Sequence, residues 1–129
     1  LEGSLLYDTL NKILYATDAS AYRIMPEAVA LPKTTEDIVK LMHFAREHAI
    51  SLTPRTAGTS LAGQTVGSGI VVDVSKHFTN IVSFNKENKT VTVQPGVIRD
   101  ELNLFLKPHG LFFGPNTSTS SSGNKSCFE

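Results

Sequence analysis

The sequence lacks the features of a disulfide-rich, nucleic-acid-binding or membrane-spanning protein. Cys127 is the only cysteine, so neither an internal disulfide nor a cysteine zinc site can form. The 12 basic and 12 acidic residues cancel without clustering, which argues against nucleic acid as a partner. No apolar stretch approaches the roughly 20 residues that a transmembrane helix needs, and no signal-peptide pattern is visible. We therefore expect a cytoplasmic protein, and peripheral attachment to a membrane stays open.

The chain does have enough apolar residues for one folded domain. It has 129 residues, and 40% of them are hydrophobic. Apolar residues recur at both helical and strand spacing, which predicts an α+β fold. The predicted helices cover residues 4–15, 35–48 and about 98–106, and the predicted strands cover 28–31, 50–53, 70–74, 81–85, 90–94 and 111–113. Thr34 and Asp37 form a capping-box pattern, and the polar residues 86–89 favour a hairpin.

Residues 54–64 read Pro-Arg-Thr-Ala-Gly-Thr-Ser-Leu-Ala-Gly-Gln and are the strongest functional signal in the chain. This glycine loop has little to pack into a core, but it can present several main-chain N–H groups and hydroxyls together. Such nests bind anions, phosphates above all. The loop therefore predicts a site for a phosphate-containing cofactor, and a surface loop without a ligand is the alternative.

Two common nucleotide-binding motifs do not fit this loop. Gly58, Gly63 and Thr65 match the P-loop pattern, but Gln64 stands where that pattern needs a lysine for the outer phosphates. The helix that follows a P-loop is also not expected, because the chain leads straight into the strand predicted at 70–74. The Rossmann pattern G-x-G-x-x-G does not occur. Hydrolysis of a nucleoside triphosphate is therefore disfavoured.

Other candidate residues give weaker signals. Residues 114–119, Gly-Pro-Asn-Thr-Ser-Thr, follow a predicted strand and could form a second polar surface. Asp73 lies within an apolar strand, either exposed at its end or bonded to neighbouring main chain, and we do not expect it to be catalytic. The histidines, which are His43, His48, His77 and His109, lack the spacing of metal ligands. The sequence therefore predicts no metal site.

The glycine loop resembles the pyrophosphate-binding loop of FAD-linked oxidases with a PCMH-type (vanillyl-alcohol oxidase-like) FAD domain. The resemblance is closest to the glycolate oxidase and D-lactate dehydrogenase branch, and it extends over nearly the whole chain. It includes residues 26–29, 32–38, 71–75, 93–97 and 114–119.

The resemblance implies an α+β fold in which FAD lies between two subdomains, here about 1–75 and part of a second at about 76–129. The chain would then be the N-terminal part of an FAD-binding domain, incomplete at its C-terminus, in a larger enzyme. The implied FAD-binding residues are Thr56, Ala57, Gly58, Thr59, Ser60, Gly63 and Gln64 around the pyrophosphate, with Pro115, Ser118 and Thr119 along the flavin. Many relatives attach FAD covalently through a histidine where this chain has Thr59, so we expect non-covalent FAD.

The same resemblance implies a flavin-dependent oxidoreductase that oxidises a small 2-hydroxy acid, such as D-lactate or glycolate, by hydride transfer to flavin N5. Its catalytic base would lie outside these residues, so no catalytic residue is assigned, and the electron acceptor is unknown. The alternative hypothesis is a module that binds FAD or another nucleotide and has no activity of its own.

Overall fold

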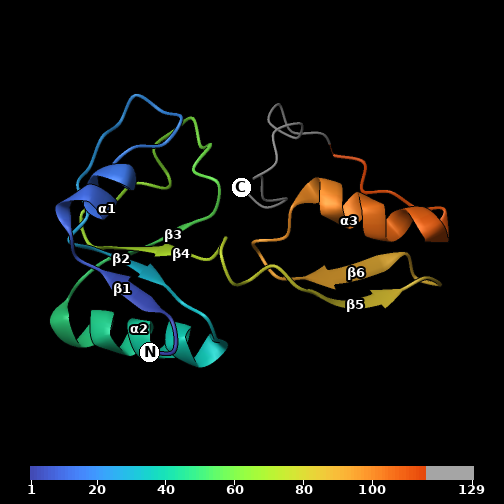
Figure 1. Ribbon diagram of the computed structural model, residues 1–129, viewed down its shortest axis with the longest axis horizontal. Coiled ribbons are helices and arrows are strands. Elements are labelled where there is room, and N and C mark those ends of the chain that lie inside the picture. The colour runs from blue at the N-terminus through green and yellow to red at the C-terminus, as the bar shows by residue number, and fades with distance from the viewer. Residues whose placement is uncertain (116–129) are drawn as a thin grey trace.

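The structure, a computed structural model, describes residues 1–115 of the chain (Figure 1). Its strands are β1 (Ser4–Leu6), β2 (Ala28–Leu31), β3 (Leu52–Arg55), β4 (Ile70–Asp73), β5 (Ile81–Asn85) and β6 (Thr90–Val93). Its helices are α1 (Thr9–Leu14), α2 (Thr35–His48), α3 (Arg99–Leu106) and the short 3-10 helix η1 (Lys107–His109). A four-stranded sheet lies between α1 and α2, and the β5–β6 hairpin with α3 lies at the other end of the molecule (Figure 1).

The larger sheet has the strand order β1-β2-β4-β3. β1 pairs antiparallel with β2, whereas β2 and β3 both run parallel to β4. The chain thus passes from β2 through α2 to β3, and β4 then inserts between those two strands. β2 and β4 are buried along their whole length. Their unbroken apolar sequences follow from this position, because a central parallel strand is covered on both faces.

A buried carboxylate joins the N-terminal segment to α2. Asp37, which is 0% exposed, accepts hydrogen bonds from the main-chain N–H groups of Glu2 and Gly3, both at 2.8 Å, and of Lys33 at 3.0 Å. The bond from Lys33 is the main reason why the pKa of Asp37 falls to about 2. Thr34 caps α2 as predicted, because its hydroxyl accepts from the Asp37 N–H at 3.2 Å. Asp37 therefore does more than close a capping box, since it also holds residues 2 and 3.

Two clusters of apolar side chains form the interior. The first lies between the sheet and α2 and consists of Ala28, Ala30, Leu41, Ile70, Val72, Val74 and Phe78. The second lies between α3 and the hairpin, with Val97, Leu102 and Leu106 at its centre. Between them the Gly96 N–H donates to the Phe78 carbonyl at 2.7 Å. A Cβ at Gly96 would lie 2.6 Å from that oxygen, so no larger residue fits there without a shift.

Two predicted elements differ from the structure. The helix predicted over residues 4–15 is a strand over its first part, and α1 begins only after Asp8, whose carboxylate accepts from the Asn11 N–H at 3.1 Å. The predicted strand at 111–113 does not form, because its N–H groups bond to α3 instead of to another strand. Phe113 donates to the side chain of Asn103, and Leu111 donates to the carbonyl of Leu106.

Candidate functional site

The first two residues of the glycine loop, Pro54 and Arg55, belong to β3, which ends two residues later than the predicted strand at 50–53. The rest of the loop, residues 56–64, follows β3 directly, and the chain then leads to β4. Because β3 and β4 are parallel, the loop starts at the same end of the sheet at which the chain leaves β4 for the hairpin. In open α/β sheets ligands bind outside the carboxyl ends of the strands. The fold therefore places the loop where a cofactor is expected.

Both glycines of the loop have a left-handed backbone that other residues rarely adopt. Gly58 has φ +69° and is buried, and a Cβ there would lie 2.4 Å from a guanidinium nitrogen of Arg55. Gly63 has φ +73°, and its Cβ would lie 2.7 Å from the ring of Tyr22. Sequence reasoning identified these glycines, whereas only the structure shows which side chains fill the space beside them.

Several main-chain donors of the loop have no acceptor in the part of the chain that the structure describes. Among residues 1–115, no protein group accepts a hydrogen bond from the N–H groups of Thr56, Ala57, Gly58 and Ser60. These residues are buried or half-buried, and such donors require a partner. A run of unpartnered N–H groups around a left-handed glycine is the geometry of an anion-binding nest.

Arg55 adds a positive charge beneath this nest. Its guanidinium donates to the carbonyls of Tyr15, at 3.4 Å, and Thr17, at 2.8 Å, and lies over the Tyr15 ring with its central carbon 5.1 Å from the ring centroid. No carboxylate in the described part of the chain lies within 4.0 Å of it. The Arg55 charge therefore has no direct counter-ion there.

Asp73 is buried and hydrogen-bonded. It is 7% exposed and accepts hydrogen bonds from the Tyr15 hydroxyl and from the N–H and hydroxyl of Ser75. Burial and then the bond to this carboxylate raise the pKa of Tyr15. Of the two predicted alternatives, exposure at a strand end or a bond to neighbouring main chain, the structure shows the second.

The remaining predicted site residues lie in different surroundings. Gln64 is exposed, and its side-chain oxygen accepts from the Ser60 hydroxyl within the same loop. Thr59 is half-buried and Pro115 is exposed. Ser118 and Thr119 lie outside the described residues. The structure thus brings the residues of the glycine loop together, and it does not test the predicted flavin-side residues.

Residues 15–22 contact the glycine loop and the residue after it, Thr65, and sequence reasoning missed this. The Ala19 N–H donates to the Gly58 carbonyl at 3.1 Å, and the Thr65 hydroxyl donates to Asp18 at 3.0 Å. The only local signal was the Asp-x-Ser pattern at 18–20, which is typical of a turn closed by a side chain. It does not reveal that the turn contacts a loop some 40 residues further on.

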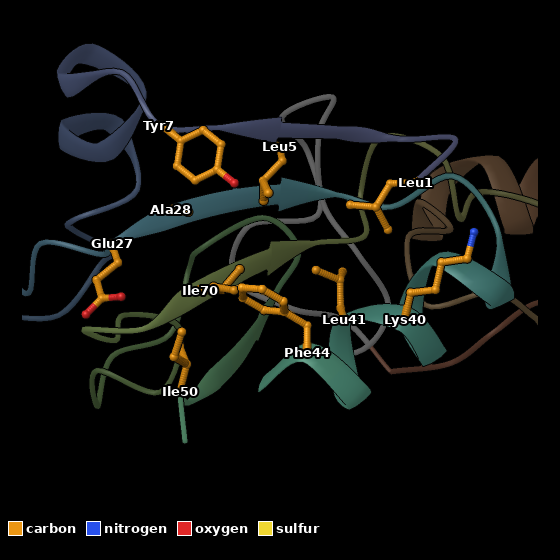
Figure 2. A pocket seen from close by; sticks show the side chains of 10 residues that line it. All are labelled: Leu1, Leu5, Tyr7, Glu27, Ala28, Lys40, Leu41, Phe44, Ile50 and Ile70. Atoms are coloured by element: carbon orange, nitrogen blue, oxygen red, sulfur yellow. The ribbon is translucent and has the colours of Figure 1, made fainter. Parts of the chain in front are cut away.

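A cavity of about 480 Å³ lies elsewhere, between α2 and the face of the sheet formed by β1, β2 and β4. Figure 2 shows Tyr7 and Leu5 on one side of it and Leu41 and Phe44 on the other. Apolar side chains make most of its wall, and Glu27 and Lys40 are the charged residues among those that line it. It is therefore unsuited to a pyrophosphate, and none of its lining residues belongs to the glycine loop.

Within residues 1–115, no three His, Cys, Asp or Glu side chains are grouped closely enough to hold a metal ion. None of the helices in this described part combines the length and the hydropathy that crossing a bilayer requires.

The loop has the geometry of an anion-binding nest, and it lies at the end of the sheet where phosphate-containing cofactors commonly bind. The chain belongs to the FAD binding domain family, whose model matches residues 26–124. This membership gives FAD as the cofactor and confirms the predicted resemblance to FAD-linked oxidases. The loop fits this group, because its open N–H groups and the Arg55 charge suit the anionic pyrophosphate.

Two relatives illustrate the similarity. The chain is 45% identical over 123 residues to D-2-hydroxyglutarate dehydrogenase of Haemophilus influenzae, a match that covers 93% of this chain and 12% of that protein. It is 36% identical over 123 residues to glycolate oxidase subunit GlcD of Bacillus subtilis, which covers 92% of this chain and 26% of that protein. The chain therefore spans only a small part of the length of these relatives.

A solved structure supports the fold. The chain resembles 6-hydroxy-D-nicotine oxidase of Arthrobacter nicotinovorans with a TM-score of 0.71, at 19% identity, over 85% of this chain and 24% of that one. The predicted α+β fold of the FAD-linked oxidase type is therefore confirmed.

Proposed function

We propose that the glycine loop binds the pyrophosphate of FAD and that the whole protein is a flavin-dependent oxidoreductase acting on small 2-hydroxy acids. The observation that carries the proposal is that the N–H groups of Thr56, Ala57, Gly58 and Ser60 have no acceptor among residues 1–115. The substrate class rests on the relatives, because D-2-hydroxyglutarate and glycolate are both 2-hydroxy acids.

Each part of the loop has a proposed role. The N–H groups of Thr56, Ala57, Gly58 and Ser60 donate to the pyrophosphate oxygens. The left-handed Gly58 lets the main chain approach the anion closely. Gly63 and Gln64 close the far side of the loop, and Gln64 orients the hydroxyl of Ser60. Pro115, Ser118 and Thr119 are proposed to lie along the flavin. FAD supplies the hydride-accepting ring when bound, and the chain holds and orients it.

We also propose that FAD lies between two subdomains divided near residue 75, of which the two apolar clusters are the cores. The electron acceptor is left unassigned, and a cytoplasmic location stays a prediction.

We infer that FAD is held without a covalent bond, because the resemblance implies that covalent attachment would use a histidine at position 59, and this chain has Thr59 there. Denaturation in acid followed by centrifugation tests this directly. Flavin is expected in the supernatant, and yellow precipitated protein would contradict the inference.

The function is tested by titrating the purified protein with FAD and following the quenching of flavin fluorescence, with ATP as competitor. We expect saturable binding of FAD that ATP displaces poorly. The flavin bound to the full-length protein is then mixed without oxygen with D-2-hydroxyglutarate, D-lactate or glycolate. Bleaching of the flavin absorbance supports the oxidoreductase, whereas FAD binding without bleaching by any of the three supports the alternative of a binding module. Preferential binding of ATP would contradict the assignment of the loop to FAD.

A further inference from the structure

We propose that residues 15–22, which precede the family match at 26–124, hold the glycine loop in its cofactor-binding shape, with Arg55, Asp18 and Thr65 as positioning residues. This inference rests on the proposed function, because it assigns the loop to FAD. It adds that residues before position 26, where the family match begins, contribute to cofactor binding.

Arg55 makes the first connection. Its side chain fills the space beside Gly58 that a Cβ would occupy. The same guanidinium donates to the carbonyls of Tyr15 and Thr17. One planar group therefore contacts the central glycine of the nest on one side and the N-terminal segment on the other, and this fixes the distance between them.

Asp18 makes the second connection, at the far end of the loop. One of its carboxylate oxygens accepts from the Thr65 hydroxyl at 3.0 Å, and the other accepts from the N–H and hydroxyl of Ser20. Partial burial opposes ionisation, but these hydrogen bonds outweigh it and lower the pKa of Asp18. The carboxylate is therefore charged at neutral pH, and a hydrogen bond to a charged group is stronger than a neutral one.

Two further contacts join residues 15–22 to the glycine loop. The Ala19 N–H donates to the carbonyl of Gly58 at 3.1 Å, so the peptide that follows Gly58 is oriented from outside the loop. The ring of Tyr22 covers Gly63. The residues at both ends of the nest are thus held by one short segment.

The two hydrogen bonds of Ser60 within the loop do not set the shape of its first half. Ser60 bonds to Gln64 and to the N–H of Ala62, the latter at 3.4 Å, and neither bond involves Thr56, Ala57 or Gly58. A loop that must present several N–H groups to one anion loses affinity if these groups have to be ordered on binding. The contacts from residues 15–22 therefore act on cofactor affinity by ordering the loop in advance.

The experiment uses paired substitutions that separate hydrogen bonding from packing. Thr65→Val removes the hydroxyl and keeps the shape, so we expect FAD to bind about tenfold more weakly. Thr65→Ser restores the donor, so its affinity should return to within about twofold of the original protein. Asp18→Ala should match Thr65→Val, and the double variant should be little worse than either one, since both remove the same contact.

Arg55 is tested by a second pair. Arg55→Met keeps the apolar stem, and Arg55→Lys keeps the charge but cannot donate in the same planar, two-pronged geometry. If Arg55 acts by holding the loop against residues 15–17, both variants should bind FAD more weakly, and this loss of affinity should persist at high salt. Recovery by lysine at low salt alone would show a purely electrostatic role and would overturn the positioning role of Arg55.

Asp8→Ala is the matched control. Asp8 also closes a turn in the N-terminal segment, by accepting from Asn11, but it lies before α1 and shows no hydrogen bond to the loop. It should lower the melting temperature and leave FAD affinity unchanged.

Amide hydrogen exchange at residues 56–64 without FAD separates this inference from the proposed function. Faster exchange in Thr65→Val, with the original rate in Thr65→Ser, supports the inference even if affinity cannot be measured for a poorly folded variant. If the original protein binds FAD and Thr65→Val changes neither the exchange rates nor the FAD affinity, the inference is overturned. The proposed function is not affected by that result. If the original protein does not bind FAD, the function and the role in binding both fail.

Discussion

Main-chain N–H groups converge at two places in this molecule, and the two differ in what they converge on. Before α2, the N–H groups of Glu2, Gly3 and Lys33 all donate to the buried carboxylate of Asp37. After β3, the N–H groups of Thr56, Ala57, Gly58 and Ser60 have no acceptor in the described part of the chain. The first place is completed by the protein's own anion, whereas the second leaves its donors available to a bound group, which we propose to be an anion. This contrast is the physical basis for assigning the glycine loop to the pyrophosphate of FAD.

The largest expected effect comes from Gly58→Val. The left-handed backbone disfavours any β-branched residue, and the new Cβ would collide with the Arg55 guanidinium. We expect FAD binding in a fluorescence titration to be lost, by a hundredfold or more.

Gly110→Ala is the control for this substitution. Gly110 has the same φ of +69°, but open space surrounds it at the end of η1. It should cost about 1 kcal/mol of stability and leave FAD affinity unchanged. Equal affinity of Gly58→Val and the original protein would count against the loop as the site.

The next largest effect is expected at the buried carboxylate of Asp37. Asp37→Asn replaces an acceptor of several N–H groups by an amide whose NH₂ cannot accept, so we expect the melting temperature to fall by several degrees. FAD affinity measured at a temperature where the variant is folded should change little. A large loss of FAD affinity without loss of stability would show that the Asp37 site influences the glycine loop.

The pH dependence of stability tests the contribution of the Asp37 carboxylate in a second way. The folded pKa of Asp37 is about 2, below its ordinary value of 3.8. The stability that this carboxylate contributes is therefore fully present above pH 3.8 and is lost as the pH falls toward 2. Thermal melts across this range should show a shallower acid dependence in Asp37→Asn. An identical dependence would mean that other carboxylates control acid unfolding.

The smallest expected effect is produced by inorganic pyrophosphate alone. It offers the anion without the rest of FAD, so it should raise the melting temperature only slightly, in proportion to its occupancy of the loop. Gly58→Val should abolish this rise. An equal rise in Gly58→Val would show that pyrophosphate binds somewhere other than the loop.

The sequence predicted what local patterns encode. α2 was predicted with its observed bounds, because a capping threonine precedes a regular apolar stripe. The hairpin at β5 and β6 was also predicted, and Val91 and Val93 share its less exposed face as expected. The glycine loop was recognised because small and hydroxyl residues around two glycines serve no core.

What the sequence could not predict depends on partners far along the chain. β1 is a strand only because it pairs with β2, and Asp37 meets donors more than 30 residues away. The contacts of Arg55 and Thr65 with residues 15–18 are of the same kind. Periodicity describes one segment at a time, so it does not reveal which distant segment supplies the other half of a contact.

The most direct test follows the main-chain N–H signals by NMR while FAD is added. We predict that the signals of Thr56, Ala57, Gly58 and Ser60 move strongly, because they gain acceptors, whereas those of Glu2, Gly3 and Lys33 stay in place, because Asp37 already occupies them. Saturation with FAD without any change at residues 56–60 would contradict the assignment of the pyrophosphate to the glycine loop.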